Sequence, residues 1–405
     1  TVSVSGHGFD IADNRTGIDV KARIDSCDTG PVKAGPTLLS ATIERKTISG
    51  RIRTRASYSG ATLLAALSGV MDFNASDIES KRPSLTIDAD FDTLSFRKDS
   101  IELNLDTLFV AALTGREKTD ISVKTGGFSV ETESALHIAD LLNSLEKVSS
   151  VVVTQLNSSD FDVPSISKIL PEMTASVRVG KDNPAGGIIS KYGITFDAIG
   201  LDASLSPERG IDAALAVRNI SLDTISLHSA DVRLTQADDD LLCRIDLDFL
   251  SQYGLPDIRA GLDAVLSGNC ATASLKVKSE IKDGTLGIRD LNTGLDLDLN
   301  ASLDRKSLSA EGRLILDGLR YGSADFGTHT VRFEGTSPDM KFFDLSADTD
   351  NIPLSVIGSF VDLGDLTTGG EVLAKVSAKG SLDSLRISGE VVPDGITVGY
   401  APFDA

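Results

Sequence analysis

Alternation of apolar and polar residues is the feature that most constrains how this chain can fold. From Leu295 to Leu303 the sequence reads Leu-Asp-Leu-Asp-Leu-Asn-Ala-Ser-Leu, with an apolar residue at every second position. Successive side chains of a β-strand point to opposite faces of a sheet, so this stretch predicts a strand with one apolar and one polar face. The same alternation recurs at residues 84–91, 99–106 and 275–281.

The connections between these stretches indicate how the strands pair. Turn signals recur roughly every ten to fifteen residues, which is typical of an all-β meander. Short connections favour antiparallel neighbours, because parallel neighbours need long crossovers. A sheet with one apolar face must cover that face, and it can do so by closing as a barrel, by stacking as a sandwich, or by curling around acyl chains.

One region interrupts the strand pattern. Apolar residues from Ile138 to Val148 recur at helical spacing, with Ser134 as a candidate cap, and a second short helix is predicted over Ser165–Leu170, ended by Pro171. The helical stripe can pack against a sheet or cap an open apolar surface. We therefore predict a β segment over 1–133, a helical insertion over 134–171 and a β segment over 172–405. Residues 61–71 are ambiguous, because their leucines also fit a short helix.

Composition narrows the class of function. The 405 residues exceed what one ordinary hydrophobic core supports, which indicates several domains or an elongated body. The net charge of −20 argues against nucleic acid and against a face lying on anionic lipid headgroups, and it favours solubility. Aromatic residues make up 5% and Trp is absent, so the apolar faces are aliphatic.

Residues that could carry chemistry are scattered. Cys27, Cys243 and Cys270 have no metal-ligand spacing; Cys243 and Cys270 could form a disulfide in an oxidising compartment, or all three could be buried thiols. The four histidines lie far apart, with no ligand partners at metal spacing. Acidic alternations within strands lack the glycine-containing loops of calcium sites. The sequence contains no nucleotide-binding or hydrolase motif, so we expect neither an enzyme nor a cofactor.

The first residue is Thr1, and no run of 18 apolar residues occurs in the sequence. The simplest expectation is a fragment of a longer chain, whose membrane anchor would lie elsewhere.

Two stretches carry a family resemblance. Lys379–Val391 resembles the Gly-x-Leu-x-x-x-x-Ile-x-Gly-x-Val strand–turn–strand unit of AsmA-like and TamB proteins, through Gly380, Leu382, Ile387, Gly389 and Val391. The family often has proline where this chain has Leu385, so the copy is degenerate. The second and more specific stretch runs from residue 170 to 196. It resembles the middle of TamB proteins from Bacteroidota in the following segments: Leu170–Met173, Val177–Pro184 and Gly193–Phe196.

Asp223–Ile225 and Thr336–Asp339 are similar to later parts of that region, and the likeness covers about half of the chain, mostly from residue 165 onward. The resemblance implies a long, mostly antiparallel β-sheet curled lengthwise into a groove with an apolar interior. It also implies a periplasmic protein whose parent chain is anchored in the inner membrane of a Gram-negative bacterium. Such a protein works with an outer-membrane barrel of the TamA type and moves phospholipid toward the outer membrane. The family's extreme C-terminal segment is not recognised here, so barrel docking is not assigned to this chain.

On this interpretation the apolar strand residues line the groove and contact phospholipid acyl chains. The candidate lining residues are Leu85, Ile87, Phe91, Ile101, Leu103, Leu105, Leu275, Val277, Leu295, Leu297 and Leu299. Roughly 25 to 30 strands about 4.8 Å apart would give an elongated body on the order of 100 Å or more. Two alternatives stay open: an envelope scaffold that assists assembly of outer-membrane barrels or autotransporters, and a secreted β-solenoid adhesin. The adhesin would need exposed aromatic platforms, and the chain has only five Tyr and no Trp.

Overall fold

The computed structural model describes most of the chain. The described residues are 1–8, 10–11, 13–60, 63–98, 101–158, 160–183, 186, 190, 193–222, 225–249, 257–283, 288–303, 305–318, 320–321, 324–325, 327–354, 366–381 and 384–400. Strands account for 72% and helices for 9%, which confirms the all-β class with a small helical part. The chain divides into two compact units: unit 1 is Thr1–Val153 with Ser165–Asp223, and unit 2 is Thr154–Pro164 with Thr224–Ala405. These bounds differ from the three predicted segments, which follow changes in element type.

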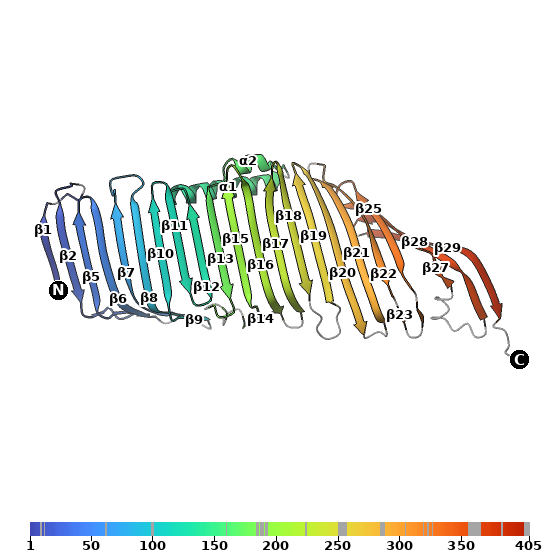
Figure 1. Ribbon diagram of the computed structural model, residues 1–405, viewed down its shortest axis with the longest axis horizontal. Coiled ribbons are helices and arrows are strands. Elements are labelled where there is room, and N and C mark those ends of the chain that lie inside the picture. The colour runs from blue at the N-terminus through green and yellow to red at the C-terminus, as the bar shows by residue number, and fades with distance from the viewer. Residues whose placement is uncertain are drawn as a thin grey trace. The chain divides into compact units, whose positions relative to one another are not determined.

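Unit 1 is a curled antiparallel sheet that is not closed into a barrel (Figure 1). Its strands are β1 (Val2–His7), β2 (Gly17–Ile24), β3 (Cys27–Asp28), β4 (Val32–Ala34), β5 (Thr37–Glu44), β6 (Thr47–Ser59), β7 (Leu63–Ser76), β8 (Ser84–Lys98), β9 (Ile101–Leu105), β10 (Leu108–Gly115), β11 (Lys118–Thr125), β12 (Phe128–Ser134), β13 (Met173–Gly180), β14 (Ile194–Thr195), β15 (Ala198–Ser206) and β16 (Gly210–Leu222). The long strands pair in the order β1-β2-β5-β6-β7-β8-β10-β11-β12-β13-β15-β16.

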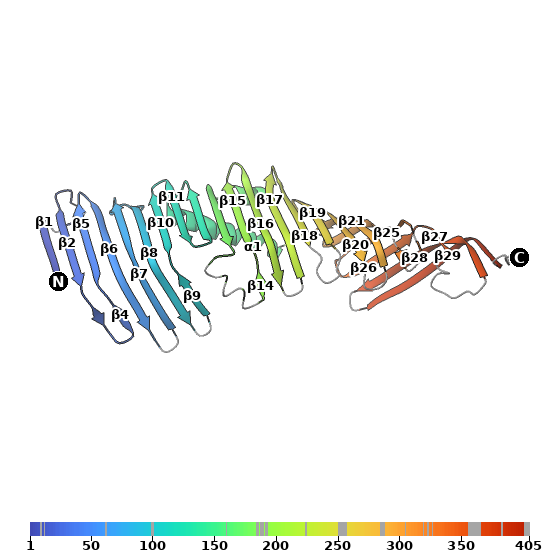
Figure 2. The same ribbon diagram turned by 60° about the horizontal axis from the view of Figure 1, so that its bottom comes forward.

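Short strands extend the rim of this sheet. β4 pairs with the end of β6, β9 with the end of β8, and β14 with the end of β16. Figure 2 shows β4 and β9 beside the longer strands that they extend. Tight turns join the long strands, as at Gly126, whose φ of +48° suits a residue without a Cβ. This meander confirms the prediction of antiparallel pairing through short connections.

Unit 2 is also built from antiparallel strands. They are β17 (Ile225–Ala237), β18 (Asp240–Phe249), β19 (Asp257–Ser267), β20 (Cys270–Asp283), β21 (Ile288–Ser302), β22 (Ser307–Asp317), β23 (Arg320–Tyr321), β24 (Ala324–Asp325), β25 (His329–Ser337), β26 (Phe342–Thr349), β27 (Ile352–Pro353), β28 (Leu366–Ser381) and β29 (Ser384–Tyr400). The long strands pair in the order β17-β18-β19-β20-β21-β22-β25-β26-β28-β29.

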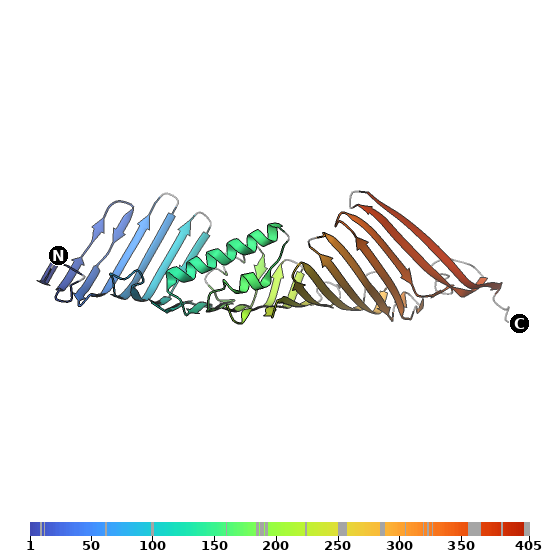
Figure 3. The same ribbon diagram turned by 90° about the horizontal axis from the view of Figure 1, so that it is seen from above.

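The helical insertion lies between two strands that are paired with each other. Helices α1 (Ile138–Ser158) and α2 (Val163–Ser167) follow β12, and β13 then returns to pair with β12. Figure 3 shows the helices on one side of the strands around them. The insertion therefore leaves the order of the sheet unchanged. The helix predicted near residue 138 is confirmed, and α2 overlaps the second predicted helix.

The ambiguous segment at residues 61–71 is resolved as strand from Leu63 onward. β7 pairs with β6 and β8 along most of its length. Helical spacing of Leu63, Leu64, Leu67 and Met71 does not prevent this, because pairing with a long strand on each side overrides the local sequence pattern. Residues 61 and 62 lie outside the described part of the chain.

Candidate functional site

The strand registers of unit 1 define an apolar face. Leu85, Ile87 and Phe91 lie on one face of β8 together with Ala89, which is buried. Directly paired residues of an antiparallel ladder point to the same face, so the row through Ala89 can be followed from strand to strand. From β1 to β16 this row reads Val2, Ala22, Leu39, Ile52, Met71, Ala89, Val110, Val123, Val130, Val177, Leu201 and Leu215.

Every member of that row is apolar, across twelve strands. At about 4.8 Å per strand the row spans roughly 50 Å within unit 1. Leu103 and Leu105 on β9 belong to the same face, because they pair with Phe96 and Leu94 at the end of β8. Ile101 begins β9, and its side chain lies outside the described part of the chain.

Unit 2 repeats the arrangement. The five candidate residues of this unit lie on a single face, with Leu275 opposite Leu297 and Val277 opposite Leu295. The row through Leu297 contains only apolar residues and glycine: Val232, Ile245, Leu262, Leu275, Leu297, Gly312, Phe333, Ala347, Val376 and Gly389. The opposite face carries Asp296 and Asp298, as the alternation predicts.

These apolar faces lack the burial of a sandwich core. Of the candidate side chains that the structure describes, Leu105 is buried and the others are half-buried. Besides Pro171, nine apolar side chains are buried among all described residues, and four of these lie between residues 141 and 170, in or beside the helices. A second sheet would bury most of the inner positions of both layers. Curling, rather than stacking, is therefore the arrangement that this chain adopts.

Some apolar-face residues are well exposed. In unit 1, Val2 is 68% and Val4 64% exposed, and in unit 2, Ile387 is 68% and Val391 66% exposed. Isolated exposed apolar residues are ordinary, but these residues are joined in rows across paired strands. The exposed positions are concentrated on the strands nearest β1 and β29. The candidate list from the sequence omitted these four residues, although Val2–His7 and Ile387–Val391 alternate in the same way.

The start of α1 is fixed on the apolar face of unit 1. Thr114 and Thr119 both lie on that face; Thr114 Oγ1 accepts from the Ile138 amide at 3.1 Å, and Thr119 Oγ1 donates to the Leu136 carbonyl at 2.7 Å. His137 caps the helix, since its Nδ1 accepts from the Ala139 amide at 3.2 Å. The predicted cap, Ser134, is wrong: it is the last residue of β12 and donates to the Glu172 carbonyl at 2.8 Å.

Glycines make room for aromatic rings on these faces. A Cβ on Gly312 would lie 2.7 Å from the Phe333 ring, and a Cβ on Gly50 would lie 2.5 Å from the Phe73 ring. Each ring therefore lies over the backbone of the neighbouring strand. At these two positions the aromatic ring lies against the sheet and does not project from it. Such a smooth apolar surface suits contact with a flexible hydrocarbon better than recognition of one rigid shape.

Ion pairs between neighbouring strands order the polar faces. Arg51 donates to both carboxylate oxygens of Asp72, at 2.6 and 2.8 Å, and Arg178 does the same to Asp202 at 2.7 and 2.8 Å. These hydrogen bonds hold the pKa values of Asp72 and Asp202 below the ordinary range. Both pairs are exposed, so each contributes little to stability.

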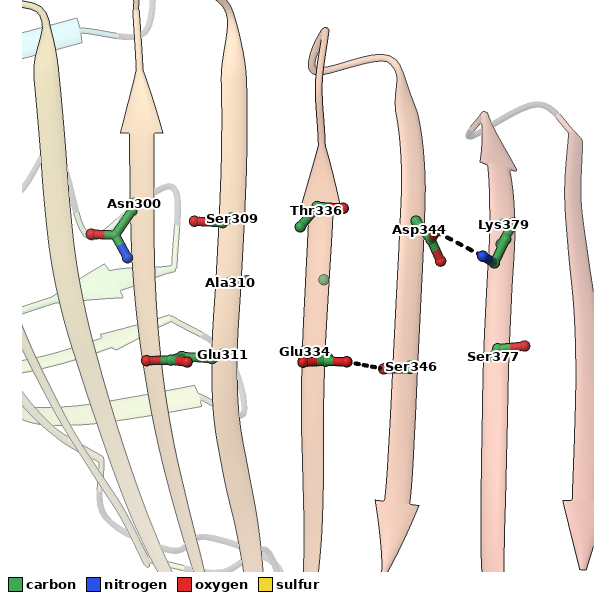
Figure 4. Close-up of a pocket in the computed structure, with 11 residues that line it drawn as sticks. Asn300, Ser309, Ala310, Glu311, Glu334, Thr336, Asp344, Ser346, Ser377 and Lys379 are labelled. Carbon is green, nitrogen blue, oxygen red and sulfur yellow. Dashed lines mark hydrogen bonds and ion pairs between the residues drawn. The ribbon is translucent and has the colours of Figure 1, made fainter.

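Shallow depressions occur on the polar faces. The one in unit 2, of about 640 Å³, lies across β21, β22, β25, β26 and β28 (Figure 4). Lys379 pairs with Asp344 at 2.8 Å inside it, and Glu334 accepts from Ser346 at 3.2 Å. No group of three or more His, Cys, Asp or Glu residues in the described ranges has metal-binding geometry. The described residues that line the depression therefore do not form a recognisable set of catalytic groups.

The predicted disulfide between Cys243 and Cys270 is wrong, because all three cysteines are free. The register explains why. Cys243 pairs with Ala264, which pairs with Ala273, so Cys243 lies on the apolar face, two strands from β20 and three residues from the level of Cys270. Two strand spacings alone are roughly 10 Å, beyond the Cα separation that a disulfide spans.

The histidines do not come together into one site. His137 is buried as a helix cap, with its Nε2 also 3.3 Å from the Pro83 carbonyl oxygen, while His7 and His329 lie on separate strands.

None of the helices in the described part of the chain combines the length and apolar character that crossing a membrane requires.

Comparison of the chain with protein-family models, with curated proteins and with solved structures found no match.

Proposed function

We propose that the apolar faces of units 1 and 2 bind phospholipid acyl chains, and that this chain is the periplasmic segment of a TamB/AsmA-like envelope protein that carries phospholipid between the inner and outer membranes. The parent chain would be anchored in the inner membrane of a Gram-negative bacterium. A TamA-type outer-membrane barrel would be its partner. Such a conduit requires no catalytic residue and no cofactor.

The observation that carries the proposal is the register-aligned apolar face of each unit, which no second sheet covers among the described residues and which in unit 1 also holds the start of α1. Transfer of hydrocarbon from water to an apolar surface gives about 0.8 kcal/mol per buried CH₂, so an acyl chain covering several strands gains several kcal/mol. The half-buried Leu297 and Leu103 would gain burial in the same step. Aliphatic side chains without deep pockets favour weak, unspecific contacts, which allow a lipid to move along the face.

The resemblance at residues 170–196 and 379–391 supports the envelope location and the lipid substrate. The opposite faces, with their Asp and Arg rows, support exposure of the outer surface to an aqueous compartment. A protein that carries lipid through water requires an apolar face for the lipid and a charged face toward the solvent.

Mass spectrometry of lipid extracted from the purified protein tests the proposal. Phospholipid should copurify with the protein after gel filtration in detergent-free buffer, and should be lost when charges are placed on the apolar face, as in Leu103→Arg with Leu297→Arg. Charges on the polar face, as in Asn104→Arg with Asp298→Arg, provide the matched control. Lipid-free protein, or equal loss in both double variants, would argue against acyl-chain binding.

A second candidate is an envelope scaffold that receives strands of outer-membrane proteins. The observation in its favour is β29, which pairs with β28 and leaves Ile387 and Val391 exposed. An exposed strand edge offers main-chain hydrogen bonds to an incoming strand. Peptide trapped on β29, in protein that carries no lipid, would favour this function over the first.

A further inference from the structure

Positive charge gathers near the N-terminal end of unit 1, against the acidic character of the whole chain. Between residues 15 and 60 there are nine Lys and Arg against four Asp and Glu, a local net charge of +5, whereas the whole chain carries −20. Several of these cations share the polar face of neighbouring strands: Lys21, Arg23, Lys33, Arg51, Arg53 and Arg55. The charge of this protein is therefore unevenly distributed.

Two arginines of this group differ from the paired arginines on the polar faces. Arg51 is paired with Asp72, Arg178 with Asp202 and Arg313 with Asp296. Arg53 instead lies between Leu38 and Val70, and Arg55 lies opposite Ser68. Among the residues that the structure describes, neither guanidinium has a carboxylate within ion-pair distance.

Arg55 borders a depression of about 580 Å³ on the polar face of unit 1. The depression forms where small residues from β6, from β7 and from the position just after β4 lie together: Gly35, Ser57, Ala66 and Ser68. Lys33 and Arg55 stand on one side, and Thr93 and Asp92 on the other. Asp92 is the extra residue of a bulge opposite Ser68 and Gly69, an irregularity that often accompanies a functional site.

The chemistry of these groups suits an oxyanion. Lys33 has one weak ion pair, with Asp28 at 3.9 Å, and Arg55 offers a guanidinium fork that matches paired oxygens. The hydroxyls of Ser68 and Thr93 can each donate one further hydrogen bond, whereas Ser57 Oγ donates to the Lys33 carbonyl at 3.5 Å. This set of donors exceeds what the two oxygens of a carboxylate accept, and it fits the three terminal oxygens of a phosphate.

We propose that this depression binds a phosphate group, either as inorganic phosphate or as the phosphate of a small ester such as a lipid headgroup. Lys33 and Arg55 supply the positive charge, and the hydroxyls of Ser68 and Thr93 orient the oxygens. Asp92 lowers the affinity by repulsion and keeps the site exchangeable. The site lies on the opposite face from the rows proposed to bind acyl chains, so it does not depend on that proposal.

Titration calorimetry with inorganic phosphate and with glycerol 1-phosphate, at constant ionic strength set with sodium chloride, tests the site. We expect saturable binding, a loss of affinity of about tenfold or more in the Lys33→Gln/Arg55→Gln double variant, and a gain of several-fold in Asp92→Asn. Arg244→Gln is the matched control, because Arg244 is already paired with Asp246 at 2.9 Å in unit 2; it should bind as the wild type does.

Tighter binding of glycerol 1-phosphate would identify an ester headgroup as the source, and equal binding would identify free phosphate. Circular dichroism of each variant checks that the sheet is intact. Heats indistinguishable from those of sodium chloride would overturn the proposal. The same conclusion would follow if the folded Lys33→Gln/Arg55→Gln double variant kept its affinity.

Discussion

Leu297 and Asp298 are adjacent in β21 and have opposite roles. Leu297 belongs to the apolar row of unit 2, between Leu275 and Gly312. Asp298 lies on the polar face, opposite Glu311. Leu297→Asp places a charge among apolar neighbours and should lower the free energy of unfolding by about 2–4 kcal/mol. Asp298→Leu removes a like-charge neighbour and should change it by no more than about 0.5 kcal/mol. Urea unfolding measures both, and equal effects would show that the face assignment is wrong.

Arg51 and Asp72 give a pH prediction at the same scale. The hydrogen bonds from Arg51 hold the pKa of Asp72 below its ordinary value of 3.8. A lowered folded-state pKa favours the folded state at pH values above the unfolded pKa, and this contribution is lost as the pH falls through the folded value. Titration of the Asp72 carboxyl by NMR should therefore show a higher pKa in Arg51→Gln than in the wild type. Identical titration curves would mean that the pair does not persist in solution.

Helix α1 depends on a cap that its sequence did not reveal. Ser134 lies four positions ahead of Ile138, the first residue of α1, but register with β13 keeps Ser134 in β12. His137 acts instead, and its ring also reaches the Pro83 carbonyl between β7 and β8. A contact made across 54 residues leaves no local sequence signal, so helical periodicity could predict the helix but not its first residue.

Substitutions at His137 test this cap. His137→Ala removes the acceptor for the Ala139 amide and should lower the stability of the first helical turn by about 1–2 kcal/mol. His137→Asn keeps a capping acceptor and should recover part of that loss. Hydrogen exchange of the Ala139 and Leu141 amides measures the effect. If the Ala139 and Leu141 amides exchange as slowly in His137→Ala as in the wild type, the imidazole cap does not stabilise the helix.

Most of each unit's face pattern could be predicted from strand alternation alone. Period-two patterning placed ten of the eleven candidate residues on the apolar faces, and Ile101 is outside the described side chains. Alternation cannot say which strands are neighbours, however, and this is why a disulfide between Cys243 and Cys270 seemed feasible. The residues of the proposed phosphate site were also not predicted, since Lys33, Arg55 and Thr93 come from three strands that only the register brings together.

For the whole molecule, the expectation of an elongated body stays a prediction. Small-angle X-ray scattering of the purified chain should give a radius of gyration well above the value of roughly 22 Å for a compact protein of this length. A value near 22 Å would contradict an extended sheet. Gel filtration alone would not suffice, because self-association through β1 or β29 would also raise the apparent size.

Lipid crosslinking from single photoreactive residues tests the central claim most directly, namely that acyl chains contact the apolar faces. The chain offers matched neighbours: positions 103 and 297 on the apolar faces, and positions 104 and 298 on the polar faces of the same strands. We predict phospholipid adducts from 103 and 297 and few or none from 104 and 298, in both units. Adducts from both faces alike, or from neither, would contradict the lipid conduit and leave the scaffold as the better account.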